Sequence, residues 1–374
     1  MQRLLLVLFL LPFVVLAGGE LGRPGGPEPG GGGWPTDSMQ SLDGPYLIYD
    51  GDALVARWVN AGTGEAGMVP FGAPLPHFPT FRAESVQTGN RFPFQEEVEF
   101  EGVSRVAALS DIHGQYDMAR KLLESNGIVD SLGDWTYGDG HLVIVGDVFD
   151  RGDQVNEALW FIHYLQQQAA AAGGRLHFLL GNHETLVMDG EETYINDRYR
   201  KAMGLLGRSY RELYGPDTYL GRWLRSLPLA VKINGDVFVH GGISKPMIRT
   251  VGSLRKMNKL YHNFLMDAND VMALRESNFA LDMLHGRQGP LWYRGYFSKN
   301  NFPEEDIDYV LRKLDAKTMI VGHTSFESIK SFYHGKIYAI DSSIKFGSMG
   351  ELLLIEDGEY RRGTVYGTAL ALAK

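Results

Sequence analysis

A short apolar run that stops at a cluster of Asp, His, Asn and Gly occurs five times between residues 105 and 325. Such runs, rich in Val, Ile and Leu, are typical of strands buried inside a sheet. In open α/β sheets the functional loops lie at the carboxyl edge of the strands, so we expect the five clusters to meet there. They are residues 111–114 (DIHG), 146–152 (GDVFDRG), 181–184 (GNHE), 240–242 (HGG) and 322–324 (GHT).

The segments between these clusters predict the connections of the sheet. Helical patterns at residues 116–126 and 154–172 separate the first three runs, which implies parallel neighbouring strands. The Asn234-Gly235 dipeptide predicts a hairpin over residues 229–240. Two further strands are expected at residues 336–340 and 351–356. The predicted fold class is therefore α/β (α+β), with two packed mixed β-sheets flanked by helices, and a helical cap at about residues 245–305.

The first hundred residues divide into three parts. Residues 1–17 have one Arg, an apolar run and small residues at the −3 and −1 positions, which is the layout of a cleaved signal peptide. Its apolar run is too short to span a bilayer. Gly and Pro occupy 13 of the positions 18–35, so we expect a linker over residues 18–43. Strands and an arm are expected at residues 44–100, and the catalytic domain at residues 101–374.

The composition limits which catalytic mechanisms and partners are possible for this chain. The chain has no cysteine, which excludes disulfides, thiolate zinc sites and a cysteine nucleophile. Its 36 basic and 45 acidic side chains give a formal net charge of −9, which argues against a nucleic-acid partner. With the signal peptide removed, we expect an exported monomer in the periplasm or medium, with no stable membrane insertion.

The cluster side chains suit a pair of metal ions. Asp111 and His113, two residues apart at a strand exit, can point at one ion, and Asp147 is the natural bridge to a second. Mixed nitrogen and oxygen donors favour Mn, Fe or Zn over Ca. A single Gly-Asp or Gly-His pair is common in turns, so the prediction depends on all five clusters together. The seven histidines outside the clusters are expected in the core or on the surface.

The motifs DIHGQYD, GDVFDRGD, GNHE, HGGIS and VGHT together resemble the signature of the binuclear metallophosphoesterases, in the phosphoprotein phosphatase branch. The N-terminal segment, the run LGRWLRSLP and the element WYRG are similar to those of the bacterial Shewanella-like phosphatases. Ser110 departs from the branch, which usually has Gly there. The similarity covers about residues 44–357.

The resemblance implies a role for each motif residue. Asp111, His113 and Asp147 would bind the first metal, and Asp147, Asn182, His240 and His323 the second. A hydroxide bridging the metals would attack phosphorus. His183, oriented by Asp150, would protonate the leaving oxygen, Arg151 and Arg294 would hold the phosphate, and Glu184 would support a ligand. Arg294 could instead be a surface side chain covering Trp292 or Tyr293.

The predicted function is a metal-dependent phosphatase that hydrolyses phosphomonoesters. Its substrate would be a phosphorylated protein, carrying phosphotyrosine or phosphoserine/threonine, or a small phosphomonoester. Hydrolysis of dinucleoside polyphosphates or other nucleotides is the alternative within the same chemistry. A catalytically dead phosphoprotein-binding module is a third reading, disfavoured because every ligand and acid position is intact.

Overall fold

The computed structural model describes residues 42–87, 89, 92–266, 271–298 and 302–372. The expected signal peptide at residues 1–17 and the linker up to residue 41 lie outside this range. Strand β1 (Leu42–Asp50) begins two residues before the expected start at Gly44. The reason is Asp43, which looks like a linker residue but is buried, and which accepts hydrogen bonds from Tyr46 at 2.6 Å and Asn156 at 2.8 Å.

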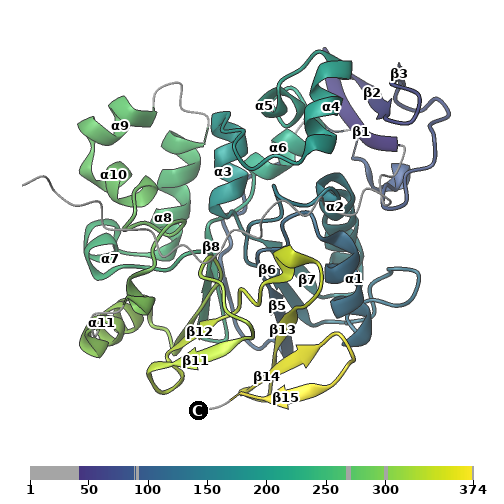
Figure 1. Ribbon diagram of the computed structural model, residues 1–374. Coiled ribbons are helices and arrows are strands. Elements are labelled where there is room, and N and C mark those ends of the chain that lie inside the picture. Colours follow the sequence, from purple (N-terminus) through teal and green to yellow (C-terminus); the bar gives the residue numbers. More distant parts are fainter. Residues whose placement is uncertain (1–41, 88, 90–91, 267–270, 299–301, 373–374) are drawn as a thin grey trace, which may run out of the picture. The chain divides into compact units, whose positions relative to one another are not determined.

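Two mixed six-stranded sheets form the centre of the catalytic domain (Figure 1). The first has the order β15-β14-β13-β5-β6-β7, and the second has the order β11-β12-β10-β9-β8-β4. This confirms the predicted architecture of packed mixed sheets with helices. The strands are β4 (Glu99–Phe100), β5 (Arg105–Leu109), β6 (His141–Ile144), β7 (Arg175–Phe178), β8 (Ala230–Ile233), β9 (Asp236–Val239), β10 (Thr318–Val321), β11 (Lys330–Phe332), β12 (Ile337–Ala339), β13 (Glu351–Glu356), β14 (Glu359–Thr364) and β15 (Ala369–Ala371).

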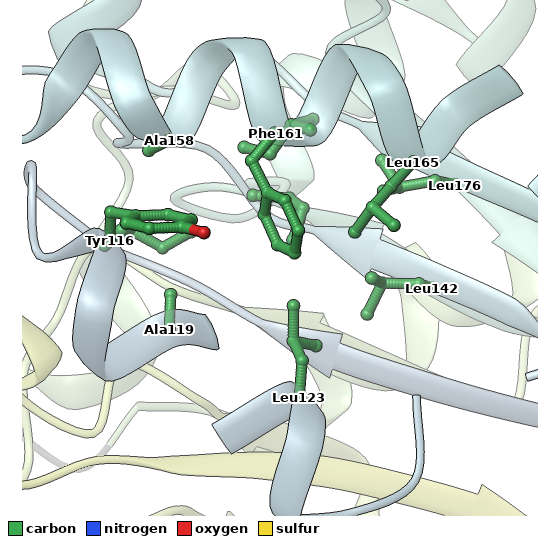
Figure 2. A pocket seen from close by; sticks show the side chains of 11 residues that line it. Tyr116, Ala119, Leu123, Leu142, Ala158, Phe161, Leu165 and Leu176 are labelled. Carbon is green, nitrogen blue, oxygen red and sulfur yellow. The ribbon is translucent and has the colours of Figure 1, made fainter. Parts of the chain in front are cut away.

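In the first sheet, β5, β6 and β7 are parallel neighbours joined by α1 (Tyr116–Ser125) and α2 (Val155–Ala171), as the strand and helix order predicts. Figure 2 shows Phe161 of α2 pointing into the layer between Leu123 of α1 and Leu142 of β6. The other side chains lining this space are almost entirely apolar, so it is packing core. Ile112 belongs to this lining, which anchors the loop that carries Asp111 and His113.

In the second sheet, β8 and β9 form the predicted antiparallel hairpin. Its turn residues Asn234 and Gly235 have φ of 52° and 86°, the left-handed pair that a tight hairpin turn requires. Strand β10 pairs in parallel with both β9 and β12. The carboxyl ends of β9, β10 and β12 therefore lie at one edge of the sheet.

The N-terminal strands make a separate antiparallel sheet of β1, β2 (Ala53–Asn60) and β3 (Glu65–Pro70). Strand β3 lies in the region where strands were expected, but the sequence did not delimit it, because its EAGMVP run is short and most of its residues are exposed. Arg198 joins this sheet to the core: its guanidinium lies 2.7 Å from Glu157 and 3.3 Å from Asp43 and donates to the carbonyl of Leu42.

The remaining α-helices connect strands along the chain: α3 to α6 come between β7 and β8, and α7 to α11 come between β9 and β10. They are α3 (Asn182–Asp189), α4 (Asp197–Leu206), α5 (Tyr210–Leu213), α6 (Tyr219–Arg225), α7 (Lys245–Val251), α8 (Leu254–Leu260), α9 (Val271–Ser277), α10 (Phe279–His285) and α11 (Glu304–Leu314). Helices α7 to α10, drawn in green, occupy the predicted cap region (Figure 1). Of the helices in the described ranges, none is both long and apolar enough to cross a membrane.

Replacing Arg198 tests whether the buried ion cluster holds the N-terminal sheet in place. Arg198→Met leaves the carboxylates of Asp43 and Glu157 buried without their cation, so we expect the free energy of unfolding to fall by about 3–5 kcal/mol. Arg200→Met is the matched control, because Arg200 contacts Asp197 at the surface and its loss should cost less than about 1 kcal/mol. Equal losses in denaturant titrations of the two variants would contradict this account.

Candidate metal centre

The five polar clusters come together at the carboxyl ends of the central strands. Asp111 follows β5, Asp147 follows β6, Asn182 starts α3 after β7, and His240 and His323 follow β9 and β10. The backbone is left-handed at three of these five residues: φ is 54° at Asp111, 56° at Asp147 and 62° at His323. Non-glycine residues in this left-handed region cost about 1 kcal/mol each, and such strain is concentrated at functional sites.

Asp147 is the centre of the cluster. Its Oδ2 lies 3.3 Å from His240 Nε2, 3.6 Å from His113 Nε2 and 3.9 Å from His183 Nε2. Its Oδ1 accepts the backbone N–H of His183 at 2.9 Å. The donor atoms form two groups that share this carboxylate, one with His113 and His183 and one with His240 and His323.

In the second group, the donor atoms of Asn182, His240 and His323 face one another. His240 Nδ1 lies 2.8 Å from the carbonyl of Val145, so Nδ1 carries a proton and Nε2 is the nitrogen that would face a metal ion. That Nε2 lies 2.9 Å from Asn182 Oδ1 and 3.2 Å from His323 Nδ1. These three atoms converge beside the Asp147 carboxylate, an arrangement that a cation would satisfy. The oxygen and nitrogen donors fit a divalent transition metal.

The first group is arranged in the same way. His113 Nδ1 faces the carbonyl of Phe149 at 2.8 Å, which leaves Nε2 free to point at Asp147. Asp111 Oδ2 accepts from the Ser110 hydroxyl at 2.5 Å and from the His323 N–H at 2.9 Å. Its Oδ1 is left facing His113 Nε2 at 3.9 Å. One carboxylate oxygen and one imidazole nitrogen are therefore aimed at the space beside Asp147.

Burial sets the protonation of these groups. Desolvation lowers the pKa of His113 and of His323 well below the usual value, which keeps both imidazoles neutral as a metal ligand requires. Desolvation, with the nearby Asp341 carboxylate, raises the pKa of Asp111 well above its usual range. Desolvation opposes protonation of His240, but Asp147 and Asp111 outweigh it and raise its pKa to about 10. The carboxylates of Asp147 and Asp111 thus stabilise positive charge at this position.

Glu184 and two glycines fix the ligand backbone. The Glu184 carboxylate accepts the N–H groups of Asp147 at 2.9 Å, Val148 at 2.7 Å and Gly181 at 2.7 Å. A Cβ at Gly181 would lie 2.2 Å from Asp147 Oδ1, and one at Gly322 would lie 2.6 Å from Asp111 Oδ2. Only glycine leaves room for the carboxylates at these two positions. Glu184 thus holds the backbone that carries Asp147, consistent with a supporting role.

His183 is paired differently from the other histidines. Its Nδ1 lies 2.6 Å from Asp150 Oδ2, and both side chains are buried. Burial raises the pKa of Asp150, and the hydrogen bond to His183 opposes that rise. A carboxylate partner stabilises a protonated imidazole more strongly than the carbonyl partners of His113 and His240 do.

Arg294 lies beside a metal ligand, and Arg151 lies beside Tyr194. Arg294 Nη2 lies 3.5 Å from His323 Nδ1, and the Trp292 ring centroid is 5.7 Å from that of His323. Arg294 therefore lies at the site, and not only over Trp292 or Tyr293. The Arg151 guanidinium lies 5.5 Å from the ring centroid of Tyr194. The structure thus brings together nine of the ten site residues that the sequence predicts, and it places the tenth, Arg151, beside Tyr194, whose ring neighbours His183.

Three neighbours of the site were missed by the sequence analysis. Ser110 hydrogen-bonds Asp111, although the resemblance marked it only as a departure. Asp341 is fully buried and accepts from Ser325 at 2.5 Å, directly after β12. It continues the pattern of a strand ending at an acidic residue, which is the signal that could have found it. Tyr194 lies in a loop and carries no such signal.

A binuclear carboxylate and imidazole site at the edges of two mixed sheets defines a metallophosphoesterase. A family model for the calcineurin-like phosphoesterases matches residues 104–325, more than half of the chain. The chain belongs to that family, whose members bind two divalent metal ions. It is a metallophosphatase, a hydrolase that acts on phosphoric monoesters, as the motifs predicted.

Individual relatives support the resemblance to the Shewanella-like phosphatases. The crystal structure of a cold-active protein-tyrosine phosphatase from a psychrophilic Shewanella species is 39% identical, with a TM-score of 0.79, over 89% of this chain and 99% of that chain. Shewanella-like protein phosphatase 1 of Plasmodium berghei is 27% identical over 64% of this chain and 67% of its own. An uncharacterised Schizosaccharomyces pombe protein is 27% identical over 72% of this chain and 82% of its own.

Chelation tests whether the converging donors hold metal. A ligand present at 100 to 1,000 times its Kd stabilises the folded state by about 3–4 kcal/mol, so stripping the metals should lower Tm by about 5–10 °C. Adding Mn²⁺ back should restore it, as followed by calorimetry. Asp147→Asn should lose most of this response, while Asp357→Asn, in an exposed turn, should keep it. An undiminished response in Asp147→Asn would contradict the assignment of Asp147 as the shared ligand.

Proposed function

We propose that this protein is an exported, metal-dependent protein phosphatase that removes phosphate from phosphotyrosine residues. The observation that carries the proposal is the position of Asp147. Its Oδ2 faces three imidazole nitrogens at 3.3 to 3.9 Å, one of which belongs to the His183–Asp150 pair. Metal-binding groups and an acid–base pair thus lie around a single carboxylate.

The donor atoms suggest how two ions would be held. Asp111, His113 and Asp147 would bind one, and Asp147, Asn182, His240 and His323 the other, with Mn, Fe or Zn as the candidate metals. When bound, two such ions would supply Lewis acidity and a nucleophile derived from water at neutral pH. The chain has no cysteine to act as a nucleophile, so phosphotyrosine cleavage here would depend on metal chemistry.

We assign His183 to proton transfer and not to metal binding. Its ring could reach an ion, because His183 Nε2 lies 3.9 Å from Asp147 Oδ2. Its Nδ1, however, is bound to the Asp150 carboxylate at 2.6 Å, which stabilises the charged imidazolium that a general acid requires. His183 would donate its Nε2 proton to the leaving oxygen of the substrate.

Arg151 and Arg294 would bind the phosphate oxygens. Planar guanidinium groups suit this task because they can donate two parallel hydrogen bonds to one phosphate. Desolvation lowers the pKa of Arg294, while Asp111 and Asp147 oppose that shift, which is the electrostatic setting of a cation facing the metal ligands. The similarity to a Shewanella protein-tyrosine phosphatase over nearly the whole chain supports phosphotyrosine as the substrate class.

A substrate panel with two variants tests this proposal. Wild-type protein with Mn²⁺ should hydrolyse a phosphotyrosine peptide with higher kcat/KM than a phosphothreonine peptide or diadenosine tetraphosphate. His183→Asn should lose about 10²- to 10⁴-fold on the phosphotyrosine peptide. Its loss on p-nitrophenyl phosphate should be smaller, because p-nitrophenolate leaves without needing a proton. Asp147→Asn should be inactive on both.

Two results would count against the proposal. Faster cleavage of diadenosine tetraphosphate than of every phosphopeptide would favour a nucleotide hydrolase. An equal loss in His183→Asn on both aryl phosphates would place His183 among the metal ligands, since a ligand acts on every substrate alike.

Export is the second part of the proposal. The apolar run and small residues of positions 1–17 support secretion to the periplasm or medium. We expect the mature chain to begin at Gly18. N-terminal sequencing of protein purified from its native source would test this, and a retained Met1 would contradict it.

A further inference from the structure

Tyr194 lies beside the proposed proton donor. Its side chain is 44% exposed, whereas that of the neighbouring His183 is buried. The two ring centroids are 5.2 Å apart and the rings are tilted by 59°. The Arg151 guanidinium lies 5.5 Å from the Tyr194 ring centroid. Tyr194 therefore borders both the group that would hold the phosphate and the group that would protonate the leaving oxygen.

The loop that carries Tyr194 is fixed to the Arg151 backbone on both sides. The Tyr194 carbonyl accepts the Arg151 N–H at 2.9 Å, and the Asn196 side chain donates to the Arg151 carbonyl at 2.9 Å. Asn196 also caps α4 by accepting the N–H of Arg198. The backbone at Tyr194 is thus tied to that of Arg151.

The geometry of proton transfer determines which part of a substrate would meet this ring. A general acid must lie within hydrogen-bond distance of the oxygen it protonates. Since His183 Nδ1 is occupied by Asp150, that contact falls to His183 Nε2. The group attached to the leaving oxygen must then extend from His183 toward solvent, where the exposed face of Tyr194 lies.

We propose that Tyr194 is a specificity-determining residue, whose ring packs against the aromatic ring of the phosphotyrosine leaving group. The inference rests on the proposed function and names the contact that distinguishes an aryl from an alkyl phosphate. Aromatic pairs at centroid distances of about 4.5–7 Å are favourable in tilted arrangements, such as the one that Tyr194 already makes with His183. A serine or threonine side chain offers no ring for this contact.

The test compares Tyr194→Ala and Tyr194→Phe with the wild type on a phosphotyrosine peptide, with inorganic phosphate as an inhibitor. Tyr194→Ala should lower kcat/KM for the peptide about 10-fold. It should change the Ki of phosphate, which has no leaving group, by less than about 2-fold. Tyr194→Phe should stay within about 2-fold of wild type on both measures. The backbone contact with Arg151 survives in each variant.

A matched control is Tyr366→Ala. Tyr366 is 85% exposed and also has a cation over its ring, Lys121 at 6.0 Å, but it lies in the turn between β14 and β15. It should change neither measurement. A Tyr194→Ala protein in which peptide kcat/KM and phosphate affinity fall together would overturn the proposal, because Tyr194 would then only position Arg151.

The two proposals fail in different ways. A wild-type protein with no activity on phosphotyrosine overturns both. A wild-type protein that cleaves phosphotyrosine, with Tyr194→Ala equal to it in kcat/KM, overturns only the role of Tyr194.

Discussion

The site depends on one buried carboxylate that faces two sets of donors. Asp147 lies between imidazoles contributed by strands of both sheets, so the sheets must keep a fixed spacing for the donors to converge. Its backbone is held by the Glu184 carboxylate, and its second oxygen is held by the His183 N–H. A buried carboxylate is stable only with positive charge nearby. The fold therefore provides the ligands, and it also provides a buried negative charge that a metal ion would neutralise.

Bringing the ligands together requires strained backbone conformations in the loops that carry them. Asp111, Asp147 and His323 adopt left-handed backbone conformations that free chains avoid. Hydrogen bonds between neighbouring loops sustain them: the His113 N–H donates to the Asp147 carbonyl at 2.9 Å, and the Asp111 N–H donates to the Gly146 carbonyl at 3.1 Å. The strands that precede these loops are buried, and the left-handed residues lie in the loops that carry the ligands.

The sequence predicted the parts whose signal is local. Buried runs ending in Asp or His identified the strand ends, and Asn234-Gly235 identified the hairpin. Contacts between distant segments had no such signal. Arg198 ties Asp43 to Glu157 across more than one hundred residues, and β3 is set by its pairing with β2. Tyr194 takes its place from a backbone bond to Arg151. These features follow from the tertiary fold and not from residue patterns.

The central claim is that two metal ions share Asp147. The most direct measurement is a crystal structure of the protein grown with Mn²⁺, with anomalous scattering recorded at the metal edge. We predict two peaks about 3.5–4 Å apart. One should be bound by Asp111, His113 and Asp147, and the other by Asp147, Asn182, His240 and His323. A single peak, or two peaks that do not share the Asp147 carboxylate, would contradict the account.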